Sequence, residues 1–98
     1  MDAIAIRQTV VYARWFERLR DQQAKVRVLA RVRRLSLGNP GDCRPVGEGV
    51  SEMRIDYGPG FRVYFVQRGQ ACIVLLAGGD KRSQGRDIAS ALELAREL

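Results

Sequence analysis

The 98-residue sequence contains no histidine, only two lysines and two cysteines, and no apolar run long enough to cross a membrane. Without histidine, Ser-His-Asp and Cys-His catalysis are excluded, and the usual general base near neutral pH is missing. Cys43 and Cys72 have no motif spacing, so we expect neither a disulfide framework nor a metal site. The first residues do not read as a signal peptide. We therefore expect a reduced, cytoplasmic protein without a metal or cofactor.

Arginine is abundant by contrast. The chain has a formal net charge of +6, and 15 of its 17 basic residues are arginines. Residues 14–34 alone carry eight cations and two acids, which accounts for the whole excess. The planar guanidinium suits phosphate groups, so this asymmetry favours a polyanionic partner such as nucleic acid. A solvated helix face would have the same composition, and charge alone leaves both interpretations open.

The spacing of apolar residues predicts one domain over residues 1–98. Helical periodicity, with Thr9 as a cap, predicts a helix up to about Asp21, and two further helices follow over 22–37 and 84–97. Strands are predicted over 3–10, 49–57, 61–66 and 71–78. The order β-α-α-β-β-β-α predicts an α+β fold, in which the helices cover one face of an antiparallel sheet and the other face stays partly open.

Within the second helix, Val28, Val32 and Leu35, supported by Leu29, form the expected core stripe. Arginines at positions 20, 27, 31 and 34 form an approximate basic stripe beside it.

The segment YGPGF predicts a hairpin turn. A three-residue loop over 58–60 places Ile55 opposite Val63 and Asp56 opposite Arg62, and it keeps all apolar side chains on one face. The other face then carries a polar cluster of Arg54, Asp56, Arg62 and Tyr64. The cluster can hold a phosphate, or it can be a cross-strand salt bridge between Asp56 and Arg62.

The stretch GGDKRSQGRDI, residues 78–88, ends the apolar strand and starts the last helix. Ser83 and Asp87 suit a helix start, whereas Lys81 and Arg82 do not. The preceding strand is expected beside FRVYF, so these two cations can face Arg62. A site of cations and a tyrosine suits phosphoryl chemistry, including RNA cleavage by the RNA's own 2′-hydroxyl.

Two segments of the chain resemble small bacterial toxins of the RelE/ParE superfamily, and most closely its HigB-like branch of addiction-module killer proteins. These segments are RRLSLGNPGDCRPVGEGVSEMRIDYGPGFRVYF and LLAGGDKRSQGRDI. The resemblance covers nearly the whole chain and implies a RelE-like fold. It places the strand arginine of the family on Arg62, and its basic pair on Lys81 and Arg82. The chain lacks the histidines of some HigB toxins and the C-terminal tyrosine of some RelE toxins, so Tyr64 is considered as a substitute.

The resemblance implies the toxin of a type II toxin–antitoxin pair that cleaves mRNA on the ribosome. The expected partners are the ribosome, mRNA and a cognate antitoxin, in this branch usually a helix-turn-helix protein, through which alone operator DNA would be bound. The candidate catalytic residues are Arg62, Lys81 and Tyr64, and the candidate RNA-binding residues are Arg54, Arg82, Arg27, Arg31 and Arg34. The alternatives are a gyrase-inhibiting toxin of the ParE type and an inactive relative.

Overall fold

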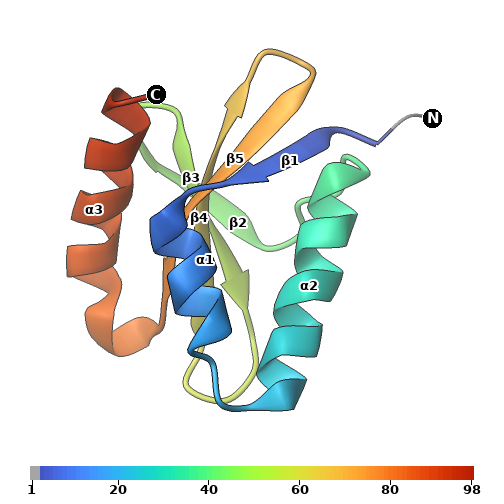
Figure 1. Cartoon of the computed structure of the whole chain (residues 1–98), viewed down its shortest axis with the longest axis vertical. Helices are drawn as coiled ribbons and strands as arrows, with labels where there is room; N and C mark the ends of the chain where they lie inside the picture. The colour runs from blue at the N-terminus through green and yellow to red at the C-terminus, as the bar shows by residue number, and fades with distance from the viewer. Residues whose placement is uncertain (1–2) are drawn as a thin grey trace.

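The computed structural model of the protein describes residues 3–98 and contains one sheet and three α-helices (Figure 1). Met1 and Asp2, which belong to the predicted 1–98 domain, lie outside the described residues. The elements in chain order are β1 (Ala5–Gln8), α1 (Val10–Glu17), α2 (Gln22–Ser36), β2 (Cys43–Gly47), β3 (Val50–Ile55), β4 (Phe61–Arg68), β5 (Cys72–Gly79), the 3₁₀ turn η1 (Lys81–Ser83) and α3 (Gln84–Arg96).

The sheet has the strand order β1-β5-β4-β3-β2. The pairs from β5 to β2 are antiparallel, but β1 lies parallel to β5, so the prediction of a wholly antiparallel sheet was wrong. Strand β2 was not predicted because Pro45 breaks its pattern. Proline is tolerated there because β2 is an edge strand, where a missing N–H costs no ladder hydrogen bond.

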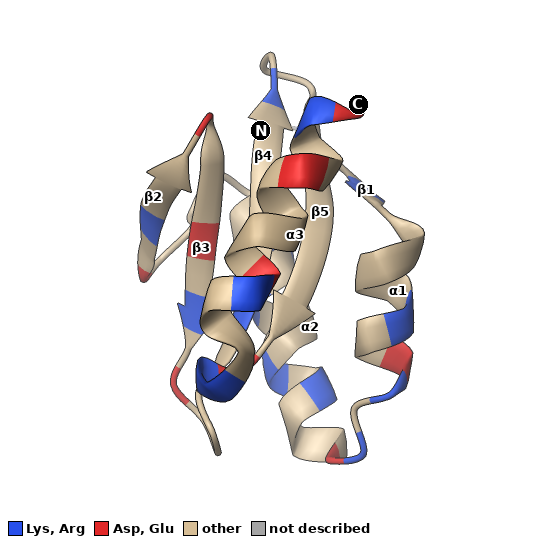
Figure 2. Cartoon of the chain, turned by 90° about the vertical axis from the view of Figure 1, so that its left-hand side faces the viewer, with Lys and Arg blue, Asp and Glu red and all other residues tan. Residues whose placement is uncertain are grey.

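The helices cover both faces of the sheet. One apolar cluster joins α1 and α2 to Met53, Val63 and Phe65, and a second joins α3 to Tyr64, Val66 and Leu76. Figure 2 shows α3 in front of the sheet, with α2 behind it. The expectation that all helices pack on one face, leaving the other open, is therefore corrected. The α+β class and the RelE-like arrangement are confirmed.

Capping residues define the helices. The Thr9 hydroxyl oxygen accepts a hydrogen bond from the Tyr12 N–H (3.0 Å) at the start of α1, and the Asp21 carboxylate caps α2. Gly38 follows α2 with a φ of +89°, a conformation that glycine adopts without steric cost. Helix α1 ends earlier than predicted, at Glu17. Leu29 was assigned to the core, but its side chain points outward and is 55% exposed.

The β3–β4 hairpin keeps the predicted faces but not the predicted pairs. Ile55 lies opposite Phe61 and Arg54 opposite Arg62, so the connection spans residues 56–60 instead of 58–60. Tyr57 stacks on Phe61 (centroids 6.5 Å apart), and its carbonyl accepts the Gly60 N–H, which closes this wider turn. The register differs by two residues, so each side chain stays on its predicted face.

No helix among the described residues is both long and apolar enough to cross a membrane.

Candidate functional site

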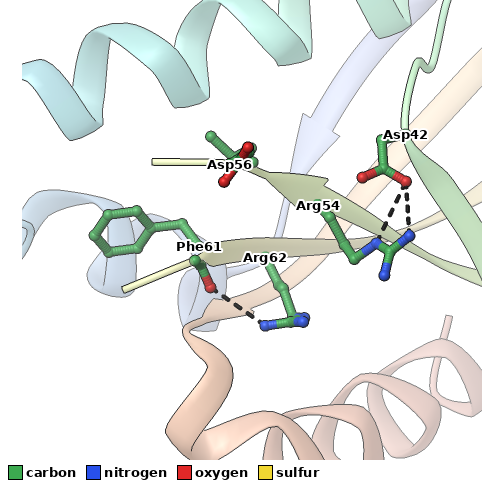
Figure 3. A pocket seen from close by; sticks show the side chains of 7 residues that line it. Asp42, Arg54, Asp56, Phe61 and Arg62 are labelled. Atoms are coloured by element: carbon green, nitrogen blue, oxygen red, sulfur yellow. Dashed lines mark hydrogen bonds and ion pairs between the residues drawn. The ribbon is translucent and has the colours of Figure 1, made fainter. Parts of the chain in front are cut away.

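A hollow of about 270 Å³ lies where β3 and β4 approach their turn (Figure 3). Arg54 and Arg62 occupy directly opposed positions on the two strands and both line it. The remaining lining residues are Asp42, Ile55, Asp56, Gly60 and Phe61. Two guanidinium groups beside one opening can receive an anion, because each offers a planar set of N–H donors.

Arg54 is held by the loop before β2. Its Nε and Nη2 donate to the same carboxylate oxygen of Asp42, at 3.3 and 2.9 Å (Figure 3). The Arg54 N–H also donates to the Asp42 carbonyl (2.9 Å), so backbone and side chain are fixed together. The guanidinium stays about half exposed and remains open to a ligand.

Arg62 is held from inside the protein. Its side chain is only 13% exposed, its Nε forms an ion pair with Glu52 at 3.5 Å without a hydrogen bond, and its Nη1 donates to the Gly60 carbonyl (3.3 Å). Glu52 is completely buried and accepts hydrogen bonds from Arg44 Nε (3.0 Å), the Tyr64 hydroxyl (2.9 Å) and Gln84 Nε2 (2.9 Å). This network joins β2, β3, β4 and the first residue of α3.

The network keeps Glu52 ionised. Burial alone would raise the pKa of its carboxyl, but the hydrogen bonds from Gln84, Arg44 and Tyr64 outweigh that effect and hold the pKa below its ordinary value. For Tyr64, burial raises the pKa and the hydrogen bond to Glu52 raises it further. Glu52 is therefore an acceptor, and the Tyr64 hydroxyl keeps its proton.

The assignment of Tyr64 as a catalytic residue is corrected. Its side chain is fully buried under α3, and its hydroxyl proton is donated to Glu52. A tyrosine in that position cannot touch RNA while α3 is in place. The open face on which that assignment depended is covered.

Lys81 and Arg82 follow the strand that pairs with the Arg62 strand, so the predicted strand neighbours are confirmed. Gly79 pairs directly with Arg62, and η1 begins two residues later. Lys81 is exposed and has no ion-pair or hydrogen-bond partner among residues 3–98. Arg82 was expected to lack a structural role, but it pairs with Asp80 at 3.1 Å. That pair is 86% exposed on the arginine side, so it is weak and can yield to a phosphate.

The start of α3 is seated closely on the end of β5. A Cβ atom at Gly79 would lie 1.8 Å from a carboxylate oxygen of Asp87 and 2.9 Å from the Ser83 hydroxyl, so a larger residue would require both side chains to move. Ser83 donates its hydroxyl proton to Asp87 and does not cap α3; Asp80 caps the preceding turn instead. These contacts fix η1, and with it Lys81, relative to Arg62.

A second hollow, of about 330 Å³, lies on the α2 side of the same hairpin and shares Ile55 and Asp56 with the first. Arg27, Arg31 and Arg34 line it. The Arg27 guanidinium lies over the Tyr57 ring, 4.7 Å from its centroid, and Arg34 is exposed. The three predicted RNA-binding arginines of α2 thus border the same hairpin as Arg54 and Arg62.

Arg31 is different from its neighbours and is corrected to a structural role. Its Nη groups donate to the carbonyls of Arg54, Pro40 and Asp42, at 2.5, 3.0 and 3.4 Å. These bonds hold the loop before β2 and the end of β3 against α2. Its Nη groups are engaged within the protein, and its Nε is buried without a hydrogen-bond partner, so the structure gives Arg31 the role of holding this loop.

Cations gather in one half of the molecule. Figure 2 shows Lys and Arg concentrated around the start of α3, the end of β3 and the adjoining parts of α1 and α2. Within residues 3–98, no group of three or more cysteine, aspartate or glutamate side chains could hold a metal ion. The arrangement can bind and polarise an anion through arginine and lysine.

Comparison with known proteins agrees with this architecture. The family described as phage derived protein Gp49-like (DUF891) matches residues 14–98. The chain belongs to the Gp49-like family. This is a family of toxin-like proteins of the RelE type. An uncharacterized protein of Haemophilus influenzae is 42% identical over 95 residues, which span 97% of this chain and 96% of that protein.

Three residues of the candidate site were missed from the sequence: Glu52, Asp42 and Gln84. Glu52 lies two residues before Arg54, on the same face of β3, and that face was expected to stay partly open, so nothing required Glu52 to be buried. One signal was present. Tyr64 and Val66 share that face with Arg62, and apolar residues there indicate a covering layer, under which a carboxylate needs partners.

Proposed function

We propose that this Gp49-like protein is the toxin of a type II toxin–antitoxin pair, of the HigB-like kind, and that it cleaves mRNA on the ribosome. The observation that carries the proposal is the pairing of Arg54 with Arg62 beside a hollow, with Lys81 two residues beyond the partner of Arg62. Two arginines line the opening, and an exposed lysine follows the strand partner of one of them, a set of cations that suits a phosphodiester.

The chemistry requires no cofactor. The 2′-hydroxyl oxygen of the RNA attacks the scissile phosphorus and its proton passes to water; the bond from phosphorus to the 5′-oxygen breaks and that oxygen takes up a proton from water. The products are a 2′,3′-cyclic phosphate and a 5′-hydroxyl end. Arg62 and Lys81 neutralise the charge that develops on the phosphate, a contribution of the kind that donors aimed at a transition state make. The guanidinium of Arg62 is mostly buried, and the electrostatic interaction between such a group and a phosphate is stronger there than in water.

The remaining cations bind the RNA. Arg54 and Arg82 lie on either side of Arg62, and Arg27 and Arg34 extend the basic surface across the hairpin to α2. A surface of this kind suits mRNA held against ribosomal RNA, since phosphate contacts position a strand without reading its sequence. The toxin-like family implies a cognate antitoxin as the second partner, and we propose that it is of the helix-turn-helix kind.

The test is a map of mRNA 5′ ends shortly after the protein is induced, in cells that express wild type or Arg62→Ala. We expect new ends in frame with codons and carrying 5′-hydroxyls, and their loss in the variant. Arg7→Ala is the matched control, because Arg7 is an exposed arginine on the edge strand β1, away from the hollow. Intact mRNA together with equal toxicity of wild type and Arg62→Ala would overturn the proposal, and DNA-damage signalling without cleavage would point to gyrase.

A further inference from the structure

Glu52 is the only fully buried charged side chain in the described part of the chain. It lies within β3 with its carboxylate turned towards α3, where Tyr64 and Gln84 donate to Oε2 and Arg44 to Oε1. Burying a carboxylate is costly unless partners surround it. Pairs of this kind add little net stability compared with apolar side chains of similar size, so stability is a weak reason for a glutamate here.

The position of Arg62 provides a better reason. Arg62 lies directly opposite Arg54, and like charges in opposed positions on neighbouring strands repel each other. Each arginine is drawn towards its own acid, Arg54 to Asp42 and Arg62 to Glu52. Asp42 precedes β2, whereas Glu52 lies within β3, so the two arginines are held by acids from different elements.

The two acids differ in rigidity. Asp42 is an exposed loop residue, more than half of whose side chain faces solvent. Glu52 has no exposed surface, and the donors that fix its two oxygens come from β2, β4 and α3. Arg62 forms an ion pair with this carboxylate at 3.5 Å, and its Nε is buried without a hydrogen-bond partner. The fixed charge of Glu52 and the burial of Arg62 restrict the orientation of the guanidinium, so less reorganisation is needed when the phosphate arrives.

We infer that Glu52 is the positioning residue of the site: it orients Arg62 towards the hollow and does not itself contact the RNA. The inference rests on the proposed function, because it assigns Arg62 to the phosphate. Removal of the charge by Glu52→Gln frees Arg62 to move away from Arg54 towards solvent. The RNA then still binds the outer cations, but the guanidinium is out of place for the reaction.

The experiment measures cleavage on programmed ribosomes as kcat and KM. For Glu52→Gln we expect kcat to fall about 10- to 100-fold, the loss that accompanies a misplacement of about 1 Å, with KM little changed. Glu52→Asp keeps the charge on a shorter side chain and should be intermediate. The matched control is Glu48→Gln, because Glu48 also pairs with an arginine, Arg96, but is exposed and lies away from the hollow. Its kcat should equal that of wild type.

A double-mutant cycle separates positioning from general destabilisation. If Glu52 acts through Arg62, then Glu52→Gln should cause no further loss in an Arg62→Ala background. Independent losses that multiply would overturn the inference, as would a wild-type kcat for Glu52→Gln.

A readout without activity distinguishes failure of this inference from failure of the proposed function. NMR of the arginine side chains in the free protein should show slow hydrogen exchange at Arg62 Nε in wild type. In Glu52→Gln, exchange there should approach that of exposed arginines. If wild type cleaves no mRNA, but exchange at Arg62 Nε is faster in Glu52→Gln than in wild type, the proposed function is wrong and the positioning role of Glu52 stands. Unchanged exchange at Arg62 in a folded Glu52→Gln protein would refute the positioning role itself.

Discussion

The two faces of the sheet are built differently. Against α1 and α2 the buried side chains of the sheet are apolar, including Met53, Ile55 and Val63. Against α3 the sheet is apolar at one end and carries the Glu52–Arg62–Tyr64 network at the other, next to the hollow. Apolar burial stabilises with little demand on geometry, whereas a buried carboxylate demands specific donors. The comparison separates a face that holds the fold together from one that orients charge.

The apolar face should give the largest loss of stability. Met53→Ala removes a fully buried side chain there, and we expect the free energy of unfolding to fall by about 2–5 kcal/mol. Leu29→Ala is the control, since Leu29 is mostly exposed on α2 and its truncation should cost no more than about 0.5 kcal/mol. Urea denaturation measures both, and equal losses would contradict the placement of the core.

Function should depend more on the α3 side. Lys81→Ala removes an exposed cation beside Arg62, and we expect mRNA cleavage to fall on the order of 100-fold, the effect of losing one donor to a transition state. Arg33→Ala removes an equally exposed cation from α2, away from the hollow, and should have a much smaller effect. Cleavage rates and growth after induction measure the loss in each variant. Comparable losses in Lys81→Ala and Arg33→Ala would argue against the assigned site.

The polar network contributes a smaller share of stability. Tyr64→Phe leaves the packing under α3 intact but removes one donor from the buried Glu52 carboxylate. We expect a loss of about 1–3 kcal/mol, the range for a buried group that loses its partner. Thermal unfolding checks it, and an unchanged melting temperature would mean that Gln84 and Arg44 alone satisfy Glu52.

Acid should reduce the contribution of Glu52. Its pKa in the folded protein lies below the ordinary value of 4.5, so its charged form stabilises the fold fully above that value, and the effect is lost as pH falls through the lower folded pKa. The stability difference between wild type and Glu52→Gln should therefore be larger at about pH 6 than at about pH 3.5. Denaturation at both values tests the sign, and a difference that grows in acid would contradict it.

The presence of the three helices could be predicted from the sequence. The face of the sheet on which each residue of β3 and β4 lies could also be predicted, because side-chain alternation is unchanged by a register shift of two. The sequence was not sufficient for the pairs themselves, since the stacking of Tyr57 on Phe61 widens the turn and depends on tertiary packing. The position of α3 was missed, although ACIVLLAG is apolar in consecutive residues, a pattern typical of a strand covered on both faces.

The candidate site was predicted in part for the same reason. Arg54 and Arg62 come together because their strands pair, and Lys81 follows the strand partner of Arg62; the neighbours of β4 were the part of the topology that could be inferred. The partners that fix them depend on long-range contacts: Glu52 meets Gln84 across 32 residues of chain, and Arg31 reaches the Arg54 carbonyl across 23. Spacing in the sequence does not reveal such contacts.

The close fit at Gly79 limits how the chain length can vary. Gly79 is tied to Arg62 by strand pairing, and the Ser83 and Asp87 side chains occupy the space that a Cβ at Gly79 would need. The short segment from Asp80 to Ser83 connects this pairing to the start of α3. An insertion or deletion of a single residue would move Lys81 away from Arg62 or lift α3 from the sheet. Across the Gp49-like family, length variation should be found at the β4–β5 turn and be absent from this segment.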